Sequence, residues 1–125
     1  MPNTRQTVKT QTYRCPVEAA VAVLGGKWKA LILWWLQQRT WRFAELRRQM
    51  PGITEKMLAQ QLRELEADGI VERRVYPTVP PKVEYSLTEY GKSLKRALRA
   101  ICDWGRNHME RTGAVAALPD RAARA

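Results

Sequence analysis

Apolar side chains recur at helical spacing in several separate stretches of the chain. Residues 16–24 begin with Pro16, which suits the first position of a helix because no partner exists there for a backbone N–H, and Gly25 follows the stretch. The clearest helix comes later, because Thr54 can cap its start and Gly69 can end it in the left-handed conformation. The same spacing predicts further helices within residues 27–38, within 43–50 and from about 89 to 111.

The second of these stretches, "KWKALILWWLQQ", is apolar over most of its length. Helical spacing places five large side chains on one stripe: Trp28, Leu31, Ile32, Trp35 and Leu36. We therefore expect a helix that is buried along this stripe.

Residues 70–76 and 82–87 alternate between apolar and polar side chains, as the two strands of a hairpin do. The connection between them contains Pro77, Pro80 and Pro81, which stiffen the loop and remove backbone donors. A short β-prone segment, "TWRF", precedes the third helix. The sequence thus predicts a stiff hairpin that projects without joining a larger sheet.

The predicted order is helix, helix, short strand, helix, helix, strand, strand, helix. A helical corner that contains Gly52, followed by another helix and then a hairpin, is typical of a winged helix-turn-helix. We expect a mainly α fold with a small β-hairpin (α+β), extended at both ends by helices that serve dimerisation. The expected organisation is a flexible N-terminal arm over residues 1–13, one folded domain over 14–112 and a disordered tail over 113–125.

Charge indicates the kind of partner. The 125 residues include 22 Lys and Arg against 12 Asp and Glu, a net charge of +10, which favours a polyanion such as nucleic acid. The longest apolar run, residues 30–36, is far shorter than the ~20 residues that span a bilayer, and the N-terminus has no secretion signal. We expect a cytoplasmic protein without membrane contact. The two cysteines and the single histidine match no metal site, so no metal or other cofactor is expected.

The fourth predicted helix carries the residue types that read base edges. With the stripe of Leu58, Leu62 and Leu65 turned inward, Lys56, Gln60 and Arg63 point outward, flanked by Ala59. Thr54 and Gln61 lie at the sides, within reach of phosphates. The alternative is an ordinary solvated helix face, and two basic against four acidic side chains in residues 51–70 give this region a net charge of −2.

Basic residues flank this helix on both sides, as expected for contacts to the DNA backbone. Residues 39–50 contain four arginines and one glutamate, a net charge of +3, and the hairpin adds further cations. The expected backbone and wing contacts are Arg42, Arg47, Arg48, Arg73, Arg74, Thr78 and Lys82. Prolines also protect strand edges against aggregation, and that remains an alternative role for the hairpin loop.

The last predicted helix has an apolar stripe that one small core cannot cover: Leu94, Leu98, Ile101 and Trp104. We expect this stripe to form a homodimer interface with the first helix of a second copy. Cys102 lies beside it and is interpreted as a small core or interface residue. Trp28, Trp34, Trp35 and Trp41 are core residues or, alternatively, the lining of a pocket for an aromatic effector.

Four blocks of sequence, spread over residues 14–110, resemble the HxlR-type winged-helix transcription regulators of bacteria, relatives of the MarR group. The blocks are "CPVEAAVAVLGGKWKALIL", "RFAELRRQMPGITEKMLAQQLRELEADGIVERRVY", "VPPKVEYSLTEYG" and "DWGRNH". The resemblance implies a homodimer on a pseudo-palindromic operator, with residues 54–67 as recognition helix and residues 77–82 as wing tip. Two positions depart from the family pattern, Ala59 in place of a hydroxyl residue and Arg39 in place of a turn glycine.

The resemblance also singles out Cys15, because several members of the family sense oxidants or electrophiles through the cysteine of this "CP" pair. A cysteine just before a helix, next to Arg14, lies in a positive environment that favours a reactive thiol. The alternative is an inert capping residue. The sequence leaves open whether Cys15 pairs with Cys15 of another copy or with Cys102.

These observations predict a sequence-specific, DNA-binding transcription regulator, a repressor rather than an activator, whose binding responds to a small electrophile at Cys15 or to an aromatic ligand. A non-specific nucleic-acid or chromosome-architecture protein is the main alternative. An enzyme is not expected, because no His or acidic partner for Cys15 lies nearby in the sequence. The operator, the target genes and the inducer cannot be read from the chain.

Overall fold

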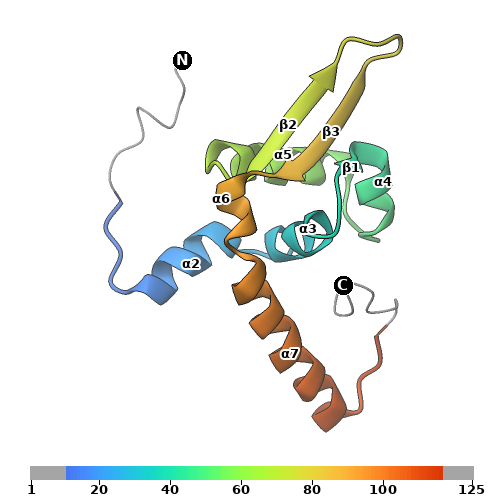
Figure 1. The fold of residues 1–125 in the computed structure, drawn as a ribbon. Coiled ribbons are helices and arrows are strands. Elements are labelled where there is room, and N and C mark those ends of the chain that lie inside the picture. The colour runs from blue at the N-terminus through green and yellow to red at the C-terminus, as the bar shows by residue number, and fades with distance from the viewer. Residues whose placement is uncertain (1–10, 117–125) are drawn as a thin grey trace.

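A computed structural model describes residues 11–116, so most of the predicted N-terminal arm and C-terminal tail lies outside the described residues (Figure 1). Within this range the elements follow the predicted order, with a short strand before the helical corner and a hairpin after it. In chain order they are α2 (Pro16–Leu24), α3 (Lys29–Leu36), β1 (Trp41–Arg42), α4 (Phe43–Arg48), α5 (Glu55–Ala67), β2 (Val71–Tyr76), β3 (Lys82–Leu87), α6 (Glu89–Lys92) and α7 (Lys95–Thr112).

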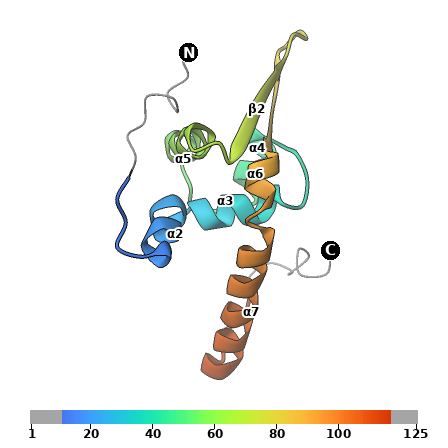
Figure 2. The ribbon, with the colours of Figure 1, turned by 60° about the vertical axis from the view of Figure 1, so that its left-hand side comes forward.

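The three strands form one small antiparallel sheet in the order β1-β3-β2. Strands β2 and β3 pair along their whole length, from Val71 opposite Leu87 to Tyr76 opposite Lys82. Strand β1 adds two residues at the base of β3, with Trp41 opposite Tyr85. The outer part of the hairpin therefore projects beyond the body as a two-stranded wing (Figures 1 and 2).

The core lies between helices α3, α4 and α5 and the base of the sheet. Leu33, Leu46, Leu58 and Leu65 are completely buried, and Val71 closes the core from the sheet side. The stripe predicted for α5 is confirmed, because Leu62 is buried together with Leu58 and Leu65. Burying each side chain of this size contributes roughly 1.5–3 kcal/mol, which makes this the main source of stability.

The buried face of α3 differs from the predicted stripe. Ile32, Leu33 and Leu36 are buried, whereas Leu31 is 44% exposed. The helix is apolar on almost every side, with Trp34 and Trp35 also packed against the core, so its periodicity could not indicate which side faces inward. Contacts with the sheet and with α5 decide the rotation of the helix instead.

The predicted last helix is divided into two helices. Thr88 caps a start, as predicted: its Oγ accepts from the Gly91 N–H at 2.9 Å and donates to the Gly69 carbonyl at 2.6 Å. The helix that it caps, α6, ends after four residues, and a turn at Ser93 and Leu94 leads into α7. Gly91 lies directly against the backbone of Ile70, where an added Cβ would come within 2.2 Å of the carbonyl oxygen. This contact ties α6 to the body while α7 turns away from it.

Helices α2 and α7 leave much of their apolar surface exposed. Helix α2 has no fully buried residue, and Val17 and Val21 are exposed. Helix α7 buries Leu98, but Ile101 and Trp104 are 54% and 68% exposed and it extends away from the body on the side opposite the wing (Figure 2). No single helix within residues 11–116 has the length and apolar composition to cross a membrane; α2 and α3 would meet both criteria only together, and they are bent by 80°.

Candidate nucleic-acid interface

A helix-turn-helix corner joins α4 to α5. Gly52 has a φ of +97°, the left-handed conformation that the corner was predicted to need, and Ile53 follows it into the core. The Arg47 guanidinium donates to the Ile53 carbonyl at 3.2 Å and lies 3.4 Å from the Glu55 carboxylate. Arg47, predicted as a phosphate contact, thus links the end of α4 to the start of α5.

Helix α5 presents a polar face to the surface of the molecule. The Thr54 hydroxyl accepts from the Met57 N–H at 3.0 Å and caps the helix, as predicted. Lys56, Gln60 and Arg63 are exposed on the outer side, and Ala59 and Gln61 are half-buried at its flanks. The structure therefore brings the three predicted base-reading side chains together on one face, within two turns of helix.

An ion pair that sequence reasoning missed fixes α5 against α3. The Lys29 ammonium lies 2.5 Å from the Glu64 carboxylate, and the Lys29 side chain is almost buried. The Gln60 amide also donates to Glu64, at 3.4 Å. These two hydrogen bonds, first the one from Lys29, lower the pKa of the Glu64 carboxyl, so this anion persists at neutral pH. Residues 29 and 64 are too far apart in the chain for a periodic pattern to pair them.

Met57 is a second residue that was missed. It lies in the first turn of α5 and is 43% exposed, beside Lys56 on the outward side rather than in the leucine stripe. An exposed apolar side chain at this position can contact the methyl group of a thymine in the major groove. The sequence did contain a sign of this exposure, because Met57 lies outside the apolar stripe, on a side of the helix that is otherwise polar.

The cations that surround α5 fall into two groups. Among residues 11–116, Arg42, Arg48, Lys56, Arg63 and Arg73 take part in no ion pair and are exposed. Arg47, Arg74 and Lys82 each lie next to a carboxylate of the same chain. The first group can bind phosphate without breaking an ion pair. In the second group a neighbouring carboxylate already offsets part of each positive charge.

The backbone of Arg42 forms the start of α4, while its side chain stays exposed. Its backbone N–H donates to the Glu45 carboxylate at 3.0 Å, which holds the first turn of the helix and lowers the pKa of Glu45. Arg39, where the family pattern has a glycine, stacks on the Trp41 ring at 3.6 Å and lies 3.7 Å from Glu45. The Arg42 side chain remains at the surface beside Arg48.

The wing separates its predicted cations onto two faces. Arg74 and Lys82 share one face, because their register partners are Glu84 and Tyr76, and adjacent strand residues point to opposite sides. Arg74 lies 3.1 Å from Glu72, and Lys82 lies 3.5 Å from Glu84 and 4.7 Å from the centre of the Tyr76 ring. Arg73 points to the other face, opposite Tyr85. The three cations therefore do not form one basic edge.

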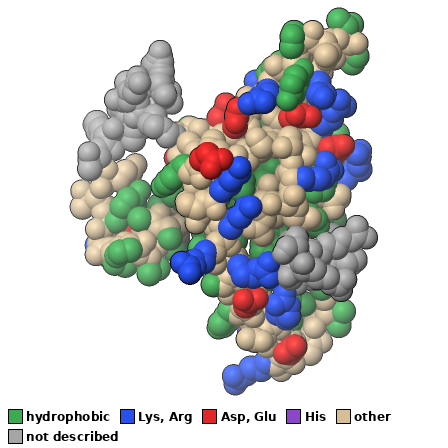
Figure 3. All heavy atoms as spheres, in the orientation of Figure 1, with side chains coloured by type: hydrophobic (Ala, Val, Ile, Leu, Met, Phe, Trp, Pro, Cys, Tyr) green, Lys and Arg blue, Asp and Glu red, His purple; other side chains and the backbone are tan. Residues whose placement is uncertain are grey.

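The tip of the wing is uncharged. Residues 77–81 contain Thr78, whose hydroxyl donates to the Pro80 carbonyl at 2.8 Å, and Val79, which is fully exposed. Basic and acidic side chains are mixed along the strands below, and hydrophobic side chains gather at the tip (Figure 3). A phosphate contact is thus expected from the strands, and only apolar or backbone contacts from the tip.

Cys15 is the residue before α2, and its side chain is exposed. The neighbouring Arg14 donates to the Glu18 carboxylate twice, from its backbone N–H at 2.7 Å and from its guanidinium at 2.9 Å. These hydrogen bonds, first the one from the backbone, lower the pKa of Glu18. Cys102 is half-buried on α7, with the Arg106 guanidinium 3.4 Å from its sulfur. Both cysteines are free thiols.

The tryptophans of residues 28–41 pack in or against the core. Trp41 is buried and packs edge-on against Trp35, with ring centres 5.9 Å apart, and its ring N–H donates to the Trp35 carbonyl at 2.7 Å. Trp28 and Trp34 pack against the same core. Of two cavities of about 400 Å³ each, one lies at the α4–α5 corner and one beside α6, and tryptophan lines neither of them. Within residues 11–116, no group of three His, Cys, Asp or Glu side chains could hold a metal ion.

Comparison with known proteins matches this arrangement to one family. A sequence model of the HxlR-like helix-turn-helix family matches residues 23–113. The chain is 55% identical over 104 residues to YtcD of Bacillus subtilis strain 168, an uncharacterized HTH-type transcriptional regulator, and the match covers 83% of this chain and 82% of that protein.

Solved structures give the same result. The crystal structure of ytcD superimposes with a TM-score of 0.73 at 56% sequence identity, over 77% of this chain and 98% of the other. The redox regulator HypR in its reduced form superimposes with a TM-score of 0.76 at 48% identity, over 79% of this chain and 98% of the other. The family model, which matches residues 23–113, includes the helical corner, the wing and α7.

Proposed function

Because the chain belongs to the HxlR-like helix-turn-helix family and is thereby a transcriptional regulator, we propose that it binds a pseudo-palindromic operator as a homodimer and represses transcription. Helix α5 is the recognition helix in this proposal, and the wing and α4 contact the DNA backbone. The relatives are regulators rather than enzymes, and the chain is assigned no catalytic role.

The outward face of α5 is the observation that carries the proposal. Lys56, Gln60 and Arg63 are exposed together on a helix whose opposite face is locked in the core. Arginine and lysine donate to guanine O6 and N7, and glutamine bonds both edge atoms of adenine, so this face suits the major groove. Met57 adds an apolar group next to Lys56, suited to a thymine methyl.

The unpaired cations around α5 supply the contacts that are independent of sequence. Arg42 and Arg48 precede the recognition helix in the chain and Arg73 follows it, and we expect these cations to bind phosphates beside the groove that the helix reads. Neutralising these phosphates releases counterions, and binding should weaken as salt is raised. This distribution compensates for the net negative charge of the segment that contains α5.

Thiol sensing through Cys15 is a second part of the proposed function. The side chain is exposed at the start of α2, and the structural relative HypR is described as a redox regulator. Helix α2 exposes Val17 and Val21 toward solvent, next to the thiol. Modification of Cys15 would alter this apolar surface, and with it the packing of α2 in a dimer.

The recognition face is tested with the double substitution Gln60→Ala and Arg63→Ala. A genome-wide footprint of the purified protein first identifies the operator, and fluorescence anisotropy then measures affinity for operator and for scrambled duplex. We expect operator affinity to fall by at least about 30-fold, because two base contacts at ~1–3 kcal/mol each are lost, while scrambled duplex is bound almost as before.

Arg96→Ala on α7 removes one positive charge away from α5 and serves as the control. Equal losses on both duplexes would contradict the assignment of the recognition face. Equal affinity of the unmodified protein for both duplexes would instead support the non-specific nucleic-acid protein that the charge of +10 also allows.

A further inference from the structure

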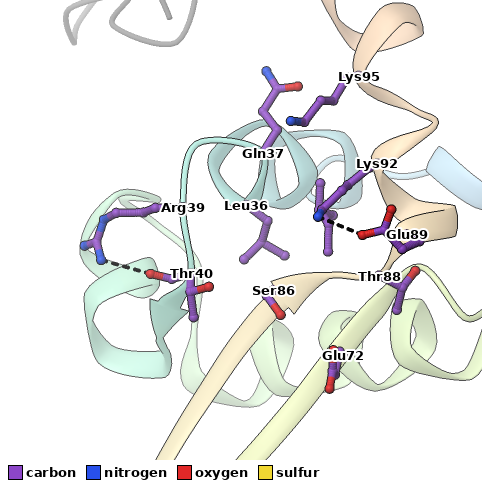
Figure 4. Close-up of a pocket in the computed structure, with 11 residues that line it drawn as sticks. Leu36, Gln37, Arg39, Thr40, Glu72, Ser86, Thr88, Glu89, Lys92 and Lys95 are labelled. Atoms are coloured by element: carbon purple, nitrogen blue, oxygen red, sulfur yellow. Dashed lines mark hydrogen bonds and ion pairs between the residues drawn. The ribbon is translucent and has the colours of Figure 1, made fainter.

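A polar cleft of about 400 Å³ lies beside α6, at the base of the hairpin and away from the wing tip. One wall comes from the end of α3 and the loop before β1, with Gln37 and Thr40. The other wall comes from α6 and the start of α7, with Lys92 and Lys95 (Figure 4). The cleft therefore lies between the winged-helix body and the helix that leaves it.

Two lysines reach into this cleft from the same wall. Lys95 extends toward the end of α3, where Gln37 lies, and Lys92 points toward the middle of the cleft (Figure 4). Among the described residues Lys95 forms no ion pair, and Lys92 pairs only with Glu89, at 2.9 Å. The Glu89 side chain is 91% exposed, so this pair is weak in water and an incoming anion can replace it.

The other charged groups of the lining are already engaged. Arg39 stacks on Trp41 and donates to the Thr40 carbonyl, and it points away from the cleft (Figure 4). Glu72 lies 3.1 Å from Arg74. The remaining donors of the lining include the Lys95 ammonium, the Gln37 amide and the hydroxyls of Thr40 and Ser86. Lys92 joins them once its pair with the exposed Glu89 is displaced, and together these groups suit an acceptor-rich anionic group.

The cleft is larger than a simple inorganic ion needs. Its volume lies within the range of small-molecule sites. Leu36 and Leu87 form a narrow apolar floor of the lining, because only 3% and 8% of these residues are exposed. An occupant that fills it would combine one anionic group with an apolar body of about one ring.

We propose that this cleft binds a small organic anion, with its carboxylate or phosphate between Lys92 and Lys95 and its body against Leu36 and Leu87. The occupant would bridge the body and the α6–α7 connection and hold α7 at one angle to the recognition helix. Its effect on transcription rests on the proposed function, because a change in that angle alters operator binding only if α7 joins two DNA-binding copies. Binding of the anion itself does not depend on DNA.

Isothermal titration calorimetry on the full chain without DNA tests the site. The probes are benzoate, phenyl phosphate, inorganic phosphate and the neutral benzamide, each at up to millimolar concentration. We expect benzoate or phenyl phosphate to bind, inorganic phosphate to bind more weakly and benzamide not to bind. Preference between the first two identifies the anionic group. Equal binding of benzamide, or no binding of either organic anion, would overturn the proposal.

Charge variants show whether the binding occurs in this cleft. Lys92→Gln and Lys95→Gln should each weaken binding by about tenfold, since each removes a charge-assisted hydrogen bond. Glu89→Gln should strengthen binding, because it removes the carboxylate that competes for Lys92. Arg96→Gln lies on α7 outside the lining and should leave binding unchanged.

A purely structural role for the lysines, as charges beside the C-terminal carbonyls of α3, predicts a different result. In that case the lysine variants would lower the thermal midpoint of unfolding without changing anion binding, and Glu89→Gln would not strengthen it; this result overturns the proposal. Anion binding that persists in a variant with weakened operator affinity, such as the Gln60→Ala and Arg63→Ala pair, would separate this site from the DNA-binding function.

Discussion

Cys15 shows what one residue and its immediate neighbours can do. Its side chain is exposed, and the adjacent Arg14 guanidinium is bound to Glu18 rather than to the sulfur. The Glu18 carboxylate thus offsets the positive charge that Arg14 was expected to provide. The partial positive charge at the start of α2 still favours the thiolate of Cys15. The structure shows directly one property that a sensing cysteine needs, because the exposed side chain of Cys15 is accessible to oxidants.

Cys15→Ser should abolish the response of operator binding to diamide and leave binding under reducing conditions unchanged. Diamide oxidises two thiols to one disulfide, so a protein that lacks the exposed thiol loses one of the reacting partners. The measurement is fluorescence anisotropy on the operator before and after diamide, with a non-reducing gel to detect cross-linked copies. Cys102→Ser is the matched variant on α7. A response that survives in Cys15→Ser would place the sensor elsewhere.

The wing is best understood at the scale of the element, because its strands determine which cations act together. Arg74 and Lys82 share a face with Glu72 and Glu84, which offset their charge, and Arg73 lies alone on the opposite face. Hydrogen bonds with Tyr76 and then with Glu72 raise the pKa of Arg74, so it stays protonated while held in place. The affinity of the wing for phosphate therefore depends on its acidic residues as much as on its basic ones.

Lys82→Ala should weaken binding to every duplex and reduce the slope of log affinity against log salt by about one, the contribution of one phosphate contact. Glu84→Gln should have the opposite effect on affinity, because it frees the Lys82 ammonium from a carboxylate 3.5 Å away. Affinities over a salt series on operator and scrambled duplex measure both effects. Arg111→Ala at the end of α7 is the charge control, and an unchanged slope in Lys82→Ala would exclude the wing from phosphate contact.

The whole molecule has an uneven distribution of apolar surface. Apolar side chains are buried in a core around α3, α4 and α5. In contrast, Val17 and Val21 on α2 and Ile101 and Trp104 on α7 remain exposed. Trp104 stacks on His108 with ring centres 5.1 Å apart, and this stack covers only part of the indole. Exposed apolar faces on the two helices outside the DNA-binding part are the surface that a second copy would cover.

Ile101→Ser together with Trp104→Ser should convert a dimer into monomers. In a symmetric dimer the change removes four apolar side chains, at roughly 1.5–3 kcal/mol each if fully buried, so the dissociation constant should rise by about 10⁴-fold or more. Light scattering after size exclusion measures the mass, and operator affinity should fall in parallel. Val79→Ser at the wing tip removes a fully exposed apolar group as a control. A dimer mass retained by the double variant would contradict this interface.

Much of the fold follows from local sequence signals. Pro16, Thr54, Gly52 and Gly69 act as predicted because a cap or a turn depends on a few adjacent residues. The leucine stripe of α5 is narrow, so only one orientation buries it, and the outward positions of Lys56, Gln60 and Arg63 follow from the same geometry. The order of the elements and the outward face of α5 were therefore predictable from the chain alone.

Tertiary contacts decided the rest. The sequence could not indicate that Leu33 rather than Leu31 is buried, because α3 is apolar on nearly every side and only its packing selects a face. The close approach of Gly91 to Ile70 and the Lys29–Glu64 ion pair both join residues that are distant in the chain. The carboxylate partners of the wing cations and the cleft of Lys92 and Lys95 likewise depend on the register and the angle of packed elements. Local patterns determined which helices and strands form, and long-range packing determined which of their charges remain free to bind.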